Sequence, residues 1–120
     1  MNAVTNPLTT EVIAALEELK AIDITVLDVA KISSVTDVMI IASGSSNRQV
    51  KALANIVHVR AKAAGFESFS LQGETAGDWI VVDLGDVVVH LMSPRLRAFY
   101  NLESLWGAPA VSTPNQVVKP

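Results

Sequence analysis

The chain has 120 residues, the size of one ordinary domain, and half of them are hydrophobic. It contains no cysteine, which excludes disulfide scaffolds, thiolate metal sites and cysteine nucleophiles. The net charge of −3 is unlike the basic balance of free-standing nucleic-acid binders, so a contact near RNA should depend mainly on a protein partner. The sequence has no signal-peptide pattern and no apolar run of the roughly 20 residues that a membrane span needs, so we expect no membrane association.

The first third of the chain predicts one helix and two strands. Apolar residues follow a helical period through Pro7–Ile22, with Thr9 or Thr10 as the expected cap. Ile24–Val29 is rich in β-branched residues and predicts a strand. Val35–Ala42 predicts a second strand that is more deeply buried, because its apolar run does not alternate with polar residues.

A second helix is predicted to begin after the Ser-Gly-Ser-Ser turn. Ser46 and Gln49 have the Ser-x-x-Gln spacing of a capping box, which marks a helix start. The helical period of apolar residues continues to Ala61, and Gly65 suits the position just after a helix end.

The second half predicts a strand, a hairpin and a short helix. Phe66–Leu71 reads as a short strand, and Asp78–Leu84 and Asp86–Met92 read as a hairpin around Gly85. Pro94 can open a short helix, since proline is favoured in a first helical turn.

The predicted order is therefore α-β-β-α-β-β-β-α, an α/β fold with a mixed sheet and helices packed on it. We expect one domain over residues 1–107 and a flexible C-terminal tail over residues 108–120, which contain three prolines and few large apolar residues.

No set of catalytic residues emerges from the sequence. The strand, Gly-Ser turn and helix are arranged as in nucleotidyltransferases, but those enzymes need paired carboxylates for Mg²⁺, and no acid-x-acid pair occurs. Asp83 and Asp86 flank Gly85, where a hairpin turn explains them. His58 and His90 have no second ligand nearby in sequence, so we expect no metal site, no cofactor and no enzymatic activity.

Two surface features are candidates for binding. Arg48, Lys51, Arg60 and Lys62 lie on the second helix, where solvated side chains are the default interpretation and an RNA-facing patch the alternative. Trp and Tyr are enriched at binding hot spots. We expect Trp79 and Tyr100 at a surface and Phe99 in the core.

Three blocks of sequence resemble one protein family. They are Asp-Trp-Ile-Val-Val-Asp-Leu-Gly-Asp-Val-Val-Val-His at 78–90, Arg-Ala-Phe-Tyr-Asn-Leu-Glu-Ser-Leu-Trp-Gly at 97–107, and Thr36-Asp37 with Ile41 to Val50. In order and spacing they resemble the ribosomal silencing factor, or Iojap, family over residues 8–107. Val38 and Leu84 stand where this family often has aromatic residues, which affects only local packing.

The resemblance implies a fold related to nucleotidyltransferases but without their catalytic carboxylates. It implies binding to ribosomal protein L fourteen on the large ribosomal subunit, at the face where the subunits meet, so that subunit joining and translation are blocked. It implies a cytoplasmic protein without a cofactor. A peripheral contact with ribosomal RNA and a homodimer of the free protein remain open.

The predicted partner-binding residues are taken from these blocks: Trp79, Asp83, His90, Arg97, Tyr100, Asn101, Leu102, Glu103, Leu105 and Trp106. The alternative function is a nucleotide-binding or nucleotidyl-transferring enzyme with a degenerate metal site. Binding of ATP with Mg²⁺ would separate the two.

Overall fold

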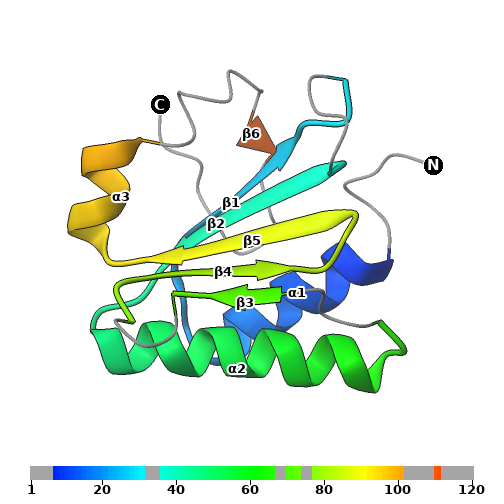
Figure 1. The fold of residues 1–120 in the computed structure, drawn as a ribbon, viewed down its shortest axis with the longest axis horizontal. Helices are drawn as coiled ribbons and strands as arrows, with labels where there is room; N and C mark the ends of the chain where they lie inside the picture. Colours follow the sequence, from blue (N-terminus) through cyan, green and yellow to red (C-terminus); the bar gives the residue numbers. More distant parts are fainter. Residues whose placement is uncertain (1–6, 32–35, 67–69, 74–76, 102–109, 112–120) are drawn as a thin grey trace.

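The computed structural model describes residues 7–31, 36–66, 70–73, 77–101 and 110–111. Its elements are α1 (Pro7–Glu18), β1 (Ile22–Asp28), β2 (Val38–Ser43), α2 (Asn47–Ala63), β3 (Ser70–Gln72), β4 (Trp79–Asp83), β5 (Val87–Met92), α3 (Pro94–Tyr100) and β6 (Ala110–Val111). The first eight follow the predicted order. In Figure 1, α1 and α2 lie beneath the sheet, and α3 lies beyond one end of the strands.

The strands form one mixed sheet in the order β3-β4-β5-β2-β1-β6. β2 and β5 are parallel, while the β1–β2, β1–β6, β3–β4 and β4–β5 pairs are antiparallel. Every residue of β2 is buried, as its uninterrupted apolar run predicts. The predicted α/β fold with a mixed sheet is therefore confirmed.

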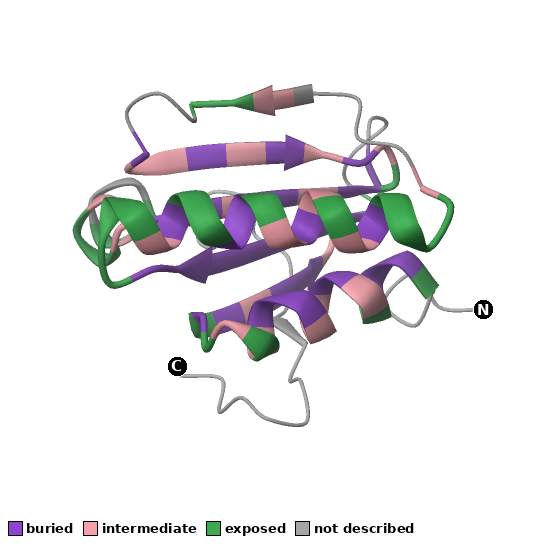
Figure 2. Ribbon diagram, turned by 90° about the horizontal axis from the view of Figure 1, so that it is seen from below, coloured by how far each residue is buried: buried purple, intermediate pink, exposed green. Residues whose placement is uncertain are grey.

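The two faces of the sheet have separate apolar cores. Alternate strand residues point to opposite faces of the sheet. Ile40, Ile80 and Val89 point into the core between the sheet and the helices α1 and α2. Figure 2 shows both helices lying across this face with their buried sides turned toward the strands. The opposite face carries a smaller cluster of Leu27, Val29, Met39, Ile41 and Met92, against which Trp79 and Leu96 pack.

The start of α2 follows the capping-box prediction and adds a tertiary contact. The N–H of Gln49 donates to Ser46 Oγ at 3.1 Å, which caps the helix. The Gln49 side-chain amide donates to the Leu19 carbonyl at 3.1 Å and so ties this end of α2 to the end of α1. Gly65 has a φ of 94°, the left-handed conformation expected just after a helix.

The first helix begins at Pro7, as predicted, but its expected threonine cap and its predicted end at Ile22 are both wrong. α1 begins at Pro7, and Thr9 and Thr10 lie inside it rather than capping it. Thr9 is buried within the helix instead. α1 ends at Glu18, because Lys20 has a φ of 58° and turns the chain into β1, which starts at Ile22.

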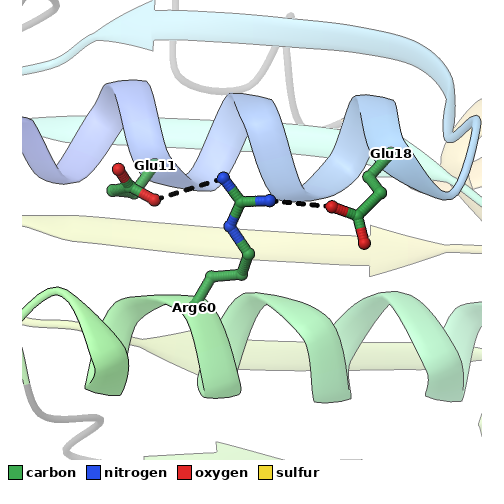
Figure 3. A network of polar contacts seen from close by, with 3 residues as sticks. All are labelled: Glu11, Glu18 and Arg60. Carbon is green, nitrogen blue, oxygen red and sulfur yellow. Dashed lines mark hydrogen bonds and ion pairs between the residues drawn. The ribbon is translucent and has the colours of Figure 1, made fainter.

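Arg60 joins α2 to α1 through two carboxylates (Figure 3). Its guanidinium lies 3.4 Å from Glu11 Oε1 and 2.8 Å from Glu18 Oε1. The three side chains are partly exposed, so each ion pair contributes at most about 1 kcal/mol and is weakened by salt. The apolar contact between the helices and the sheet contributes most to their docking.

The C-terminal region contains one strand that the sequence does not predict. Ala110 and Val111 lie in the expected tail, yet they pair with Leu27 and Val26 of β1 as β6. The outer edge of β1 offers unpaired backbone groups, and almost any short segment can satisfy them. β3, for its part, covers Ser70–Gln72 rather than the predicted Phe66–Leu71.

The β4–β5 hairpin predicts a strong requirement for glycine at its turn. Gly85 has a φ of 86°, and its N–H donates to Asp83 Oδ1 at 2.9 Å. A β-branched side chain is strained in this conformation, so Gly85→Val should lower the free energy of unfolding by about 1–3 kcal/mol. Urea unfolding measures the change. Gly85→Asn is the matched control, because asparagine tolerates positive φ, and a Val variant as stable as the Asn variant would contradict the prediction.

Candidate functional site

The half-buried residues of β4 and β5 gather on the sheet face away from α1 and α2. Ile80 and Val82 point into the helix-covered core, whereas their neighbours along β4 point the other way. β5 alternates in the same manner over most of its length. We call the half-buried set the β4–β5 face; its members are Trp79, Val81, Asp83, Val88 and His90.

Trp79 and His90 touch each other across this face. His90 pairs in register with Val81, which makes Trp79 its diagonal neighbour on the adjacent strand. The indole Nε1–H of Trp79 donates to His90 Nδ1 at 3.1 Å, and the ring centroids are 6.0 Å apart. Because Nδ1 accepts this bond, the neutral imidazole carries its proton on Nε2.

Burial also keeps His90 uncharged. Removing the imidazole from water penalises its charged form and lowers the pKa of His90 from 6.5 to about 4. At neutral pH the ring is therefore an uncharged hydrogen-bond acceptor toward Trp79. The β4–β5 face therefore presents two aliphatic side chains, the uncharged Trp79–His90 pair and, at the hairpin turn, the carboxylate of Asp83.

Arg97 fastens α3 to the start of β1 and the end of β2. Its guanidinium donates to Thr25 Oγ1 at 2.8 Å and to Ser43 Oγ at 3.3 Å. It also donates to the carbonyls of Ile22 and Asp23. Asp23 has a φ of 49° at a register shift in β1, and its carbonyl is among these acceptors. The planar guanidinium group of Arg97 therefore donates to acceptors on two strands, β1 and β2.

A groove runs beside this attachment. It has a volume of about 390 Å³ and is lined by Ile22, Asp23, Ser43, Pro94, Arg97, Ala98 and Asn101. Ser93 caps the start of α3 by accepting from the N–H of Leu96 at 3.3 Å. Asn101 ends the helix in a left-handed conformation with a φ of 47° and is exposed. We call this depression the α3 groove.

The sheet register brings the α3 groove close to the β4–β5 face. Trp79 pairs with Met92, and Met92 pairs with Ser43 across the adjacent strand. Trp79 and Ser43 are thus two strand spacings apart, about 10 Å. Because Arg97 contacts Ser43, the β4–β5 hairpin and α3 are neighbours. The β4–β5 face and the α3 groove can therefore belong to one binding surface.

The structure places some predicted partner-binding residues and not others. Trp79 and His90 meet on the β4–β5 face, and Arg97 and Asn101 line the α3 groove. Asp83 lies on the same face and closes the hairpin turn. The backbone of Tyr100 ends α3, but its side chain is not among the described ones, and the same holds for Phe99. Leu102, Glu103, Leu105 and Trp106 lie outside the described residues.

Thr25 and Ile22 join the site without any sequence signal. They reach Arg97 only through the fold, with sequence separations of 72 and 75 residues. Ser43 lies within one of the family-like blocks but was not among the predicted binding residues. Its hydroxyl is buried beside the guanidinium.

The described residues contain no group of three or more His, Asp or Glu side chains that could hold a metal ion. His58 lies on α2, which covers the face opposite His90, so the two histidines do not converge. Within the same described parts of the chain, no helix is both long and apolar enough to cross a bilayer.

Comparison with known proteins decides the family. The family model described as "Ribosomal silencing factor during starvation" matches residues 2–119. The chain belongs to the ribosomal silencing factor family. A protein of Chromobacterium violaceum named ribosomal silencing factor is 48% identical over 108 residues, covering 90% of this chain and 88% of that protein.

Solved and more distant relatives agree with this membership. A crystal structure of a Chromobacterium violaceum protein superposes with a TM-score of 0.83 at 46% identity, covering 94% of each chain. A mouse protein named mitochondrial assembly of ribosomal large subunit protein 1 is 33% identical over 99 residues, covering 78% of this chain and 42% of the mouse protein.

The lowered pKa of His90 predicts acid sensitivity of the fold. The folded-state pKa of about 4 lies below the unfolded value of 6.5, so the unfolded chain binds a proton first as the pH falls. The contribution of uncharged His90 to the free energy of unfolding is complete above pH 6.5, and it is lost progressively as the pH falls toward 4. From pH 7 to pH 5 the free energy of unfolding should fall by about 1–2 kcal/mol. Urea unfolding at each pH measures it, and His90→Gln should flatten the slope; an unchanged slope would contradict the assignment.

The Arg97 attachment predicts that lysine cannot replace arginine. A lysine ammonium carries charge but cannot span Thr25 and Ser43 with one planar fork. Arg97→Lys should therefore lower the free energy of unfolding by about 1–3 kcal/mol. Thermal unfolding gives the value, with Arg95→Lys as the control on an exposed neighbour in the same helix. Equal melting temperatures for the two variants would count against the attachment.

Proposed function

We propose that this protein represses translation by docking on the large ribosomal subunit. Its partner is ribosomal protein L fourteen, and its bulk on the face where the subunits meet blocks joining of the small subunit. Family membership supports the ribosomal role. The name of the mouse relative, which refers to assembly of the ribosomal large subunit, supports that subunit as the partner.

The observation that supports the docking site most directly is the β4–β5 face next to the α3 groove. Trp79 stands there half-buried, on a face where the described helices α1 and α2 do not pack. A large aromatic residue fixed at a sheet surface is the usual kind of binding anchor. The two features are about 10 Å apart, which fits within one protein interface.

The proposed role involves no chemical step. The sequence lacks the acid-x-acid pair of a two-metal centre. Asp83 instead accepts a hydrogen bond from the N–H of Gly85. Blocking of subunit joining then rests on binding affinity and steric exclusion alone. The same role places the protein in the cytoplasm with the ribosomes, without a cofactor.

A contact between α2 and ribosomal RNA would come from the other side of the molecule. α2 carries Arg48, Lys51, Arg60 and Lys62, and it covers the sheet face opposite Trp79 and His90. Arg60 is already paired with Glu11 and Glu18. Such a contact is therefore secondary to the β4–β5 face in the proposed complex. Homodimerisation of the free protein is a further possibility that sedimentation tests.

Truncation of the proposed anchors should weaken ribosome binding. Trp79→Ala and Tyr100→Ala should each reduce affinity for isolated large subunits by about 2 kcal/mol, because interface energy is concentrated in few large residues. Co-sedimentation with purified subunits measures binding. Val59→Ala on α2, which is 52% exposed, is the control on the opposite side of the molecule. Circular dichroism checks each fold, and normal binding by both folded anchor variants would move the docking site elsewhere.

Charge reversal after α3 gives an independent test. Glu103 lies within the family-like block at 97–107, three residues after Tyr100, and a carboxylate there can pair with a basic group of the ribosomal protein. Glu103→Lys should weaken binding by about 1 kcal/mol or more, with the larger loss at low salt. Co-sedimentation at two salt concentrations measures it. Metal-dependent nucleotidyl transfer by the wild-type protein would support the enzyme alternative instead.

A further inference from the structure

A half-buried binding residue contributes more affinity when its side chain has one orientation before binding. Trp79 is the first residue of β4, and it packs against the cluster that includes Met92. Apolar packing alone has little directional preference. An indole that rotates freely would lose conformational entropy on docking, which lowers affinity. Something specific should therefore hold the ring.

His90 is placed to do this. The backbone of His90 is paired with strands on both sides: with Val81 of β4 and with Ile41 of the central strand β2. Ile41 is completely buried, so the backbone under the imidazole belongs to the rigid centre of the sheet. From there Nδ1 accepts the indole N–H at 3.1 Å. A directional bond thus connects the anchor at the strand end to the middle of the sheet.

We propose that His90 is the positioning residue of the docking face, and that it acts on ribosome binding through Trp79 by holding the indole in one orientation. This inference rests on the proposed function, because it assumes that Trp79 contacts the ribosomal partner. It assigns to His90 a role different from that of a direct contact. The effect of replacing His90 should therefore depend on whether the indole N–H is present.

The ring chemistry agrees with this role. Accepting at Nδ1 requires an uncharged imidazole with its proton on Nε2. Desolvation lowers the pKa of His90 to about 4, so the acceptor form dominates at neutral pH. An asparagine or glutamine carbonyl can accept the same bond, whereas leucine fills similar space without an acceptor.

The first measurement needs no ribosome. In NMR spectra of the free protein, assigned with Trp79→Phe, the Nε1–H of Trp79 should exchange slowly with solvent, and the ¹⁵N shifts of His90 should report the Nε2–H tautomer. His90→Leu should speed indole exchange about fivefold or more, and His90→Gln should restore most of the protection. Fast exchange in the wild-type protein, or the Nδ1–H tautomer, would overturn the proposal whatever the ribosome does.

The second measurement is a double-mutant cycle on binding to isolated large subunits. His90→Leu should weaken binding about fivefold, as expected for one lost positioning hydrogen bond, and His90→Gln should stay within about twofold of wild type. In a Trp79→Phe background, which keeps an aromatic ring but has no N–H donor, His90→Leu should change affinity less than about twofold. His58→Leu on α2 is the matched control for histidine replacement away from the face.

The outcomes separate the two proposals. A fivefold effect of His90→Leu in both backgrounds would mean that His90 contacts the partner directly, which overturns the positioning role. Unchanged binding by a folded His90→Leu variant would overturn it as well. A wild-type protein that fails to bind large subunits at all would overturn the proposed function, and with it any role of His90 in docking, even if the hydrogen bond to Trp79 is present.

Discussion

The parallel pairing of β2 with β5 governs the rest of the fold. Two parallel strands cannot be joined by a tight turn, so the chain must leave β2 and cross over before it returns as β5. The crossover contains α2, β3 and β4, and it places α2 across one face of the sheet. β4 then enters β5 through the Gly85 turn, which fixes the hairpin register and leaves Trp79 and His90 on the opposite face.

This arrangement divides the molecule into a structural side and a candidate recognition side. The larger apolar core lies between the sheet and the helices α1 and α2, and it contains most of the buried apolar side chains that stabilise the fold. The other face has a smaller cluster, and its β4–β5 part remains half-buried. Trp79 lies on this second face, where it packs on the smaller cluster and is still partly exposed. The expectation of a surface aromatic is therefore met only in part.

Local chemistry explains which elements could be read from the sequence. Ser46 caps α2 because its hydroxyl has the spacing to reach the Gln49 N–H, and Gly85 closes the hairpin because a positive φ is needed there. The end of the first helix departs from the sequence pattern, because Lys20 enters a left-handed conformation that lysine rarely adopts. β6 was missed because pairing at an open sheet edge depends on backbone groups rather than on side-chain pattern.

The amino-acid sequence alone determined the order of the eight main elements, the mixed sheet and the family. Helical period, strand patterning, caps and turns act over a few residues, and the family-like blocks are continuous segments. Only the tertiary structure decided that Trp79 donates to His90 and that Arg97 holds α3 against Thr25 and Ser43. These contacts join residues that are 11 to 72 positions apart. Strand register and helix docking create them, and no local pattern in the sequence encodes either one.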